Sequence, residues 1–453
     1  MTLISWPRLP KKIPPAMKLY NTLTKEIETF VPSQPGEASV YCCGPTVYDK
    51  AHVGNFRTLL LNDFLVRTLR YLGLAVTSVV NITDIDDKII ARAAANDEPI
   101  SDLTARIEDL FMIDLTRLNI QSADVYPRAT EHYPEMRELI NRLTEKDFTY
   151  EHDGDLYFSI AKFPNYGRLS GIKLDQLQTT QRVRVEAEAK LVAHDFVLWK
   201  HDAHDSAGRP GWHLECSAMA EKYLGKTIDL HLGGVDLIFP HHENEIAQSE
   251  AANGQPFVRY FVHGEHMTLN GQRMGKSLGN TWTLDDLIEQ GISPLAYRYL
   301  WLTTHYRSKL NLTLESLQAA QTTLKQLKRL SLESESLSDA ERGQLAIEIL
   351  SLIEDDLNFP MALAKLHEAN SYLLWLLFEP ILGLGLESLP DEATYPDTIK
   401  QLIKRRLTAR TQKQFELSDQ LRTELEEAGY SVEDRADRTI TVPTEFLDLT
   451  IST

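Results

Sequence analysis

The sequence is poor in cysteine, has no excess of basic residues and lacks a long hydrophobic run. Its 453 residues include only 3 cysteines, too few for a disulfide framework, and an odd count is typical of a reducing compartment. Lys and Arg total 47 against 65 Asp and Glu, a formal net charge of −18, which disfavours a DNA-coating protein. The longest apolar stretch, residues 373–386, is interrupted by Glu379 and Pro380, so we expect a core helix and a turn, and no membrane span.

What is present is an ordinary globular composition, with 43% hydrophobic and 25% charged residues. A chain of this length exceeds what one hydrophobic core usually organises, so we expect several domains. The cysteine content favours a cytoplasmic location. Residues 1–17 contain basic residues and prolines but no acidic residue and no apolar core. We expect them to be an unstructured extension, with a transit peptide as the alternative and a secretory signal excluded.

The first part of the chain has the pattern of a parallel α/β sheet. Residues 38–42 are predicted to form a buried strand, and residues 75–80 to form a second one. Between them lies a helix with apolar residues on one face, which ends at Gly73. Strand, helix and strand in this order are typical of a parallel sheet with crossover helices.

Later segments indicate an insertion followed by a helical region. Residues 131–205 mix helical and strand patterns and contain a hairpin-like segment at 150–158. The sheet pattern resumes at residues 229–232, and helical periodicity dominates beyond Leu300. Residues 331–344 are rich in serine and glutamate and are predicted to be an exposed turn between helices.

A basic run near the C-terminal end stands out in this acidic chain. After a linker-like segment at residues 389–398, residues 400–413 contain six basic residues and no acidic one. Such a run is most often a solvated helix face. The alternative is a contact with a phosphate backbone.

Two short segments have the composition of phosphate-binding loops. The turn at residues 43–55 joins a strand to a helix and ends in His-Val-Gly-Asn, where a glycine lets phosphates approach the helix N-terminus. Its alternative role is a helix-capping turn. Residues 273–280 place Lys276 between glycine and serine, and a mobile ammonium suits a pyrophosphate whose charge grows during reaction. Its alternative is an ordinary surface loop.

Metal-ligand chemistry is indicated by His241 and Glu245. They are four residues apart, so on a helix they share one face and can hold one ion, although such pairs are most often surface ion pairs. Cys43 and Cys216 would complete a mixed sulfur, nitrogen and oxygen set suited to zinc, but spacing alone cannot group residues so far apart.

Three acidic residues follow the second predicted strand. Asp84, Asp86 and Asp87 suit either a magnesium ion or the cap of a helix. Helix capping is the simpler interpretation, because short acidic side chains are favoured at helix N-termini.

Taken together, these segments resemble the cysteinyl-tRNA synthetases, a family of class I aminoacyl-tRNA synthetases. The similar stretches follow the family's order along most of the chain and comprise residues 20–23, 43–55, 81–92, 154–171, 208–219, 233–249, 299–307, 355–363 and 404–434. The resemblance implies ATP-dependent ligation of L-cysteine to tRNA(Cys) through a cysteinyl-adenylate. It also implies one zinc ion per chain, ATP with Mg²⁺ as substrate, and a monomer.

The resemblance further implies roles for individual residues. Residues 52–55 stand at the family's HIGH signature, with Asn55 in place of the last histidine, and residues 273–277 stand at its KMSKS signature. The implied catalytic residues are His52, Asn55 and Lys276. The implied ATP-binding residues are His52, Gly54, Asn55, Asp236, Arg273 and Lys276. The implied cysteine pocket contains Thr83 and Trp212, and the implied zinc ligands are Cys43, Cys216, His241 and Glu245.

The implied fold class is α/β: a Rossmann-type parallel-sheet catalytic domain with a connective insertion, followed by an all-α helical bundle and a small C-terminal anticodon-binding domain. The expected division is 1–17 extension, 18–130 and 206–262 catalytic halves, 131–205 insertion, 263–325 stem-contact fold with the KMSKS-like loop, 326–398 helical bundle and 399–453 anticodon-binding domain. Two departures stand out. Arg273 and Gly275 replace the first lysine and first serine of the second signature, and residues 439–442 replace the family's terminal Thr-x-Trp-Arg.

Two other functions remain as alternatives. One is the related ligase that joins cysteine to an amino-sugar in mycothiol synthesis, which the tRNA-binding resemblance of residues 404–434 disfavours. The other is an inactive relative that only binds RNA or zinc, which Lys276 and the four intact ligand positions disfavour.

Overall fold

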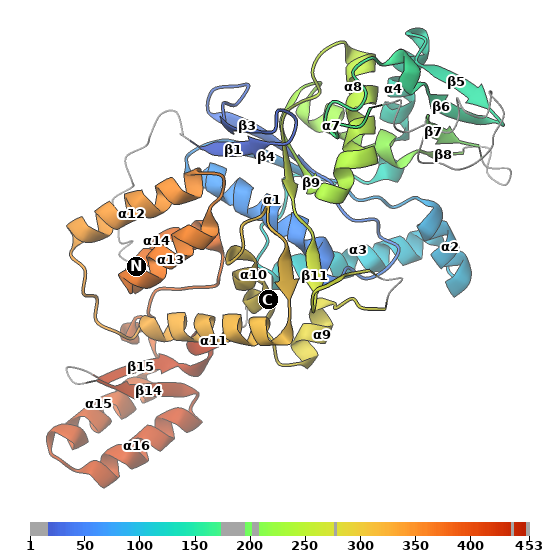
Figure 1. Ribbon diagram of the computed structural model, residues 1–453. Coiled ribbons are helices and arrows are strands. Elements are labelled where there is room, and N and C mark those ends of the chain that lie inside the picture. The colour runs from blue at the N-terminus through green and yellow to red at the C-terminus, as the bar shows by residue number, and fades with distance from the viewer. Residues whose placement is uncertain (1–16, 174–194, 202–207, 276–278, 436–438, 450–453) are drawn as a thin grey trace.

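A four-stranded parallel sheet forms the centre of the molecule (Figure 1). The computed structural model describes residues 17–173, 195–201, 208–275, 279–435 and 439–449. The sheet has the order β10-β9-β3-β4, and its strands are β3 (Glu37–Cys42), β4 (Ala75–Val80), β9 (Ile228–Gly234) and β10 (Val258–Gly264). Neighbouring strands are all parallel. The two strands predicted in the first part of the chain are therefore confirmed as β3 and β4.

Both faces of this sheet are covered, because alternate residues of each strand point into different hydrophobic cores. Val40, Leu230 and Val262 belong to one core, together with α1 (Val53–Tyr71). Tyr41 and Phe261 belong to the other, together with α4 (Tyr133–Glu145), α7 (Trp212–Leu224) and α8 (Glu243–Asn253). A parallel sheet buried on both faces explains the nearly continuous apolar runs of its strands.

Six α-helices precede β10 in the described part of the chain. They are α1, α2 (Asp87–Asn96), α3 (Ile100–Arg117), α4 (Tyr133–Glu145), α7 (Trp212–Leu224) and α8 (Glu243–Asn253). Helix α1 is the predicted crossover between β3 and β4. The chain leaves it through Gly73, whose φ of 93° is a left-handed conformation that glycine adopts without strain.

The insertion forms its own small antiparallel sheet with the order β5-β6-β7-β8. Its strands are β5 (Thr149–His152), β6 (Asp155–Phe158), β7 (Phe196–Lys200) and β8 (Arg209–Pro210). Strands β5 and β6 are antiparallel neighbours, so the predicted hairpin is confirmed. Beside the central sheet, the chain forms a second hairpin of β1 (Lys18–Asn21) and β2 (Glu26–Thr29).

The second half of the chain is mainly helical, as expected. Its elements are β11 (Met267–Leu269), β12 (Gln272–Arg273), α9 (Leu284–Glu289), α10 (Pro294–Leu302), β13 (Leu310–Leu312), α11 (Leu314–Leu330), α12 (Asp339–Glu354), α13 (Phe359–Ala369), α14 (Tyr372–Leu382), α15 (Asp397–Thr411), α16 (Phe415–Glu427), β14 (Tyr430–Asp434) and β15 (Thr439–Pro443). Figure 1 shows α15, α16 and the β14–β15 hairpin as a separate unit at one end. None of the helices in the described ranges is long and apolar enough to cross a membrane.

The prediction of an exposed turn over residues 331–344 is wrong in its second half. Helix α12 begins at Asp339, with Ser338 as its N-cap. Ser338 Oγ accepts from the Glu341 backbone amide, and the Glu341 carboxylate accepts from the Ser338 amide at 2.8 Å. Serine and glutamate three residues apart here form a capping box, which starts a helix.

The apolar stretch at residues 373–386 is the predicted core helix, α14, followed by a turn. Glu379 lies within it and is almost fully buried, and burial raises its pKa to about 7. Glu379 Oε1 accepts from the Gly385 amide at 2.7 Å, whereas Oε2 has no hydrogen-bond partner among the residues described. The proton on this group therefore stabilises the fold below about pH 4.5, and that stabilisation is lost as the pH rises through 7.

We expect Glu379→Gln to stabilise the protein more at pH 8 than at pH 5, by on the order of 2 kcal/mol, because glutamine cannot ionise. Melting temperatures at the two pH values measure this. The matched control is Glu368→Gln on α13, where the side chain is 77% exposed and no pH-dependent difference is expected. The same difference in melting temperature between Glu379→Gln and the unmodified protein at both pH values would contradict the prediction.

Candidate active site

The candidate site residues gather at the carboxyl ends of the central strands. From β3 the chain continues to β4 on one side of the sheet, whereas β9 and β10 lie on the other. Ligands of open parallel sheets bind in the crevice at such a reversal of strand order. Cys43 follows β3, Thr83 follows β4 and Asp236 follows β9, so all three lie at this edge.

Cys43, Cys216, His241 and Glu245, here called the donor set, converge next to this crevice. Their ligand atoms all lie within 4.8 Å of one another. Cys216 is on α7 and Glu245 is in the first turn of α8. His241 lies in the helical turn Ile238–His242 that precedes α8. Tertiary structure thus brings together the four residues that spacing alone left ungrouped.

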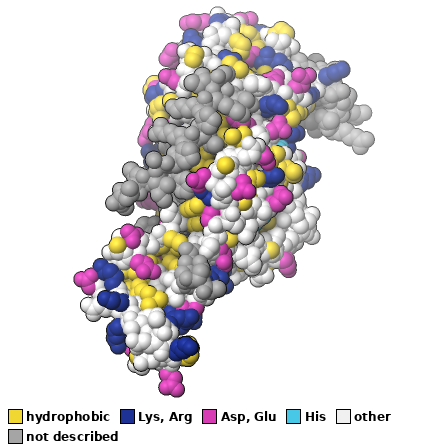
Figure 2. All heavy atoms as spheres, turned by 90° about the vertical axis from the view of Figure 1, so that its left-hand side faces the viewer, with side chains coloured by type: hydrophobic (Ala, Val, Ile, Leu, Met, Phe, Trp, Pro, Cys, Tyr) yellow, Lys and Arg dark blue, Asp and Glu magenta, His cyan; other side chains and the backbone are white. Residues whose placement is uncertain are grey.

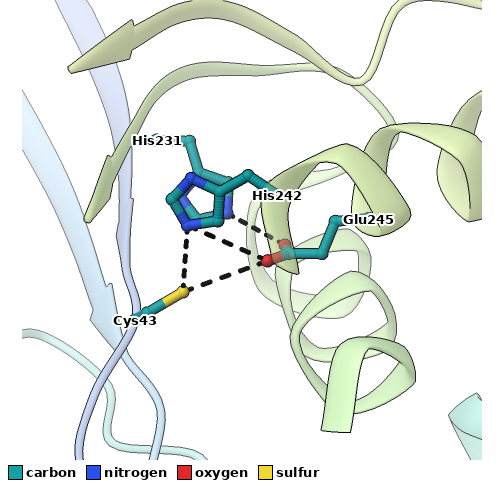
Figure 3. A group of neighbouring side chains, drawn as sticks. All are labelled: Cys43, His231, His242 and Glu245. Atoms are coloured by element: carbon teal, nitrogen blue, oxygen red, sulfur yellow. Dashed lines mark hydrogen bonds and ion pairs between the residues drawn. The ribbon is translucent and has the colours of Figure 1, made fainter. Parts of the chain in front are cut away.

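A second possible metal set shares two residues with the first. Cys43, His231, His242 and Glu245 also place their ligand atoms within 4.8 Å of one another (Figure 3). In this set, however, the Nε2 atom of each histidine already has a partner. His231 Nε2 lies 2.9 Å from Glu245 Oε2, and His242 Nε2 lies 3.4 Å from Cys43 Sγ.

The donor set fits a zinc ion better, because its histidine nitrogen is unsatisfied. His241 Nε2 is buried 3.0 Å from Glu245 Oε1 but has no hydrogen-bond partner in the described part of the chain. Two sulfurs, one nitrogen and one oxygen are donors that zinc accepts. His231 and His242, here called the histidine partners, would then hold Glu245 and Cys43 from behind, as outer residues commonly do at metal sites.

The electrostatics of the donor set also favour a cation. Burial raises the pKa of the Cys43 thiol well above its usual range, and Cys216 adds to this effect. Burial likewise raises the pKa of Glu245 and lowers that of His241. Because these groups resist carrying charge on their own, a divalent cation among them would supply the stabilising charge that ionised ligands need.

Further histidines extend behind the donor set. His242 Nδ1 lies 2.8 Å from His263 Nε2, and His213 Nδ1 lies 2.7 Å from His241 Nδ1. A Cβ atom on Gly233 would come within 2.5 Å of the His242 ring, so glycine is needed for the ring to occupy this place. Sequence reasoning missed these histidines and His231. Only the occurrence of a histidine inside the buried, apolar strand β9 hinted at a polar cluster.

Trp212 and Thr83, the residues implied for the cysteine pocket, both connect to α7. Trp212 is its first residue, and its ring centroid lies 4.0 Å from that of His241. Thr83 is buried, and its hydroxyl donates to Glu215 Oε2 at 3.0 Å. Glu215 precedes Cys216, so Thr83 is tied to the helical turn that carries a member of the donor set.

The implied ATP residues His52, Gly54 and Asn55 form the start of α1. His52 is the N-cap, and its backbone amide donates to Asn55 Oδ1 at 3.0 Å, so the capping alternative describes part of this turn. A Cβ on Gly54 would lie 2.9 Å from the His52 ring and 3.2 Å from Met274 Sδ. Glycine therefore allows the second signature loop to lie against the N-terminus of α1.

The second loop is only partly described. Arg273 is exposed at the end of β12. Asn280 closes the loop, since its side chain accepts from the Gly275 amide at 3.0 Å and donates to the Arg273 carbonyl at 2.9 Å. Lys276 lies outside the described residues, and its role stays a prediction. Asp236, implied for the ATP ribose, is exposed just beyond β9.

Of the three acidic residues after β4, only Asp86 has the predicted helix-capping role, and the other two have different partners. Asp86 is the N-cap of α2 and accepts from the Ile89 amide at 2.8 Å. Asp84 accepts from the backbone amide of Thr130 at 2.9 Å. Asp87 forms ion pairs with Lys200 and Arg209.

Comparison with known proteins agrees with this geometry. Residues 29–322 match the family model of the tRNA synthetases class I (C) catalytic domain, and residues 393–440 match that of the cysteinyl-tRNA ligase anticodon binding domain. The chain is 42% identical over 455 residues to the cysteine–tRNA ligase of Chlamydia felis, which covers 92% of this chain and 95% of the relative. It is 39% identical to the cysteine–tRNA ligase of Methanosarcina mazei, and the match covers 92% of this chain and 97% of that relative.

A solved structure shows the same fold. The Mycobacterium tuberculosis methionyl-tRNA synthetase in complex with methionyl-adenylate superimposes with a TM-score of 0.56 at 16% identity, covering 77% of this chain and 82% of that one. Fold and family models together define an ATP-using class I aminoacyl-tRNA ligase with a C-terminal anticodon-binding domain. Within that class, the chain belongs to the cysteine–tRNA ligase family.

We expect the purified protein to contain one zinc ion per chain, and His241→Ala to bind zinc more weakly than any variant of the histidine partners. His231→Gln should weaken binding by about 10–100-fold, the usual effect of losing an outer partner. Competition with a chelating dye measures both affinities.

Cys42→Ala is the matched control for this experiment. Cys42 is buried beside Cys43 but belongs to neither possible metal set, so its loss should leave the zinc affinity unchanged. If His241→Ala bound zinc normally while His231→Gln bound none, the second set would be the metal site.

Proposed function

We propose that this protein ligates L-cysteine to tRNA(Cys) through a cysteinyl-adenylate, and that zinc selects the cysteine thiol. The observation that carries the proposal is the position of the donor set, which lies beside Trp212 at the same edge of the sheet as the N-terminus of α1. A thiol bound to the metal would thus belong to a substrate lying in the nucleotide crevice.

The first chemical step needs positioning and charge stabilisation more than covalent help. The cysteine carboxylate attacks the α-phosphorus of ATP, and pyrophosphate leaves with its Mg²⁺. His52 and the α1 amides behind Asn55 would hold the phosphates, since a helix N-terminus attracts anions. Lys276 and Arg273 would neutralise the charge that grows on the pyrophosphate. In the second step, the terminal adenosine hydroxyl of tRNA takes the acyl group and AMP leaves.

Selection against serine is the reason to expect a metal. Cysteine and serine differ by one atom, and pocket shape alone discriminates such pairs by about 1–3 kcal/mol, or 10–200-fold. Zinc held by the donor set would lower the pKa of the substrate thiol and accept its thiolate, which a serine hydroxyl cannot match. Trp212 and the histidine partners would keep His241, Glu245 and Cys43 oriented for this.

The C-terminal unit supplies the proposed tRNA contact. In the lowest part of Figure 2, Lys and Arg side chains lie around a group of hydrophobic ones, and such cations suit contact with a phosphate backbone. Helix α15 carries Lys400, Lys404 and Arg405 on its outside, around a surface cavity of about 470 Å³ lined by the two lysines.

Not every basic residue of the run at 400–413 is available to phosphate. Arg406 is buried and pairs with both carboxylate oxygens of Asp434, at 3.0 and 2.7 Å. Arg410 binds the same carboxylate at 2.8 Å. These two arginines join α15 to β14, so neither the solvated-face interpretation nor the phosphate-contact alternative applies to Arg406.

The proposed function is tested by cysteine-dependent ATP–pyrophosphate exchange, followed by transfer to tRNA. We expect exchange with cysteine to exceed that with serine by more than the roughly 200-fold that pocket shape can provide, and this preference to fall when zinc is removed. Exchange without transfer to tRNA, but with transfer to an amino-sugar, would identify the mycothiol-type ligase. No exchange at all would identify an inactive relative.

We expect the double substitution Lys404→Ala, Arg405→Ala to weaken tRNA binding and leave ATP–pyrophosphate exchange intact. Each lost phosphate contact should make the plot of the logarithm of the tRNA association constant against the logarithm of the salt concentration less steep, by about 0.7–0.9 in slope. Filter binding over a range of KCl concentrations measures the slope. Arg422→Ala on α16, which removes a cation already paired with Glu426 at 2.8 Å, is the matched control. An unchanged slope for the double variant would exclude this face of α15.

A further inference from the structure

The two segments that carry the proposed ATP residues are joined by side-chain charges. Lys50 lies in the turn between β3 and α1, two residues before His52. Asp285 lies in the first turn of α9, shortly after the loop that contains Arg273. Lys50 Nζ contacts Asp285 Oδ2 in an ion pair. The contact therefore spans the gap between the first and the second signature segment.

Asp285 is held from a second direction as well. Its other oxygen, Oδ1, accepts from Arg117 Nη1 at 2.7 Å. Arg117 ends α3 and also pairs with Asp114 at 3.0 Å, and the Asp114 side chain is only 1% exposed. Lys50, Asp285, Arg117 and the buried Asp114 therefore form a chain of ion pairs with alternating charge.

Backbone and packing contacts hold the same two segments nearby. The Val53 amide donates to the Trp282 carbonyl at 2.8 Å, and the Tyr297 hydroxyl donates to the Val53 carbonyl at 2.8 Å. Met274 is also close to Gly54, since a Cβ on Gly54 would lie 3.2 Å from Met274 Sδ. The backbone contacts hold the two segments close together, and the ion pair between Lys50 and Asp285 adds a further restraint on their relative position.

This ion pair is poorly placed to stabilise the fold. The Lys50 and Asp285 side chains are 23% and 44% exposed, and ion pairs in such surroundings add little to folding stability. Reaction rates, in contrast, depend steeply on the placement of groups around a transition state. The arrangement therefore suits control of loop position better than control of stability.

We propose that Lys50 and Asp285 are positioning residues, which hold the turn before His52 against the helix that follows the second loop while pyrophosphate forms. The inference rests on the proposed function, because it assumes that both segments contact ATP. Neither residue is among those to which the family resemblance assigns an ATP-binding role.

Asp285→Asn, Lys50→Met and the double variant test the inference in cysteine-dependent ATP–pyrophosphate exchange. We expect each single substitution to lower kcat about tenfold, with the KM for cysteine and the melting temperature unchanged. The double variant should be no slower than Asp285→Asn, because both changes remove the same contact. Asp285→Glu should recover part of the rate. At saturating ATP, added KCl should slow the unmodified enzyme more than the variants, since salt screens the ion pair.

Asp49→Asn is the matched control, since Asp49 lies in the same turn but pairs with Arg92 of α2 at 3.1 Å. We expect it to keep the unmodified kcat. Normal exchange by Asp285→Asn would overturn the inference, and so would an equal loss in Asp49→Asn, which would indicate a general loosening of the turn. An unmodified protein without any exchange would instead refute the proposed function.

Discussion

The burial of thiols, a carboxylate and imidazoles against one another is the constraint on which the rest of the site depends. Strand register creates it: Cys42 is paired with Leu232 of β9, so Cys43 emerges level with Gly233. The absence of a side chain at Gly233 leaves room for the His242 ring. Helices α7 and α8 contribute Cys216 and Glu245 to the cluster. Such a group is costly to bury without hydrogen bonds or a cation, and the histidine partners supply the hydrogen bonds.

Two electrostatically different regions lie at this edge of the sheet, namely the donor set and the N-terminus of α1. Around the donor set, the ionisable groups are buried, and burial shifts their pKa values toward the neutral forms. At the start of α1 the positive potential comes from backbone amides, which attract anions such as phosphates. The ion pair of Lys50 with Asp285 is intermediate between the two in exposure, with side chains that are 23% and 44% exposed. It is too exposed to hold the fold and close enough to the crevice to affect how the loops are placed.

The C-terminal unit shows how one run of basic residues divides into two roles. It has its own small core, made by Tyr395, Ile399, Ile403, Leu425 and Val432. Arg406 is buried beside this core and neutralised by Asp434, whereas Lys404 and Arg405 on the same helix face outward. Every third or fourth residue of a helix points to the same face. Whether a basic residue of α15 binds RNA or pairs with Asp434 therefore depends on its position relative to β14.

The sequence alone determined the elements whose signals are local. Strands β3 and β4, the crossover helix ending at Gly73 and the β5–β6 hairpin follow from hydrophobic period and turn residues within short windows. Resemblance to a known family named the donor set, which spacing could not. Tertiary structure alone decided the histidine partners, the inward turn of Arg406 and the contact of Lys50 with Asp285. These depend on segments far apart in the chain that meet only when the sheet assembles, and no local pattern records which strands become neighbours.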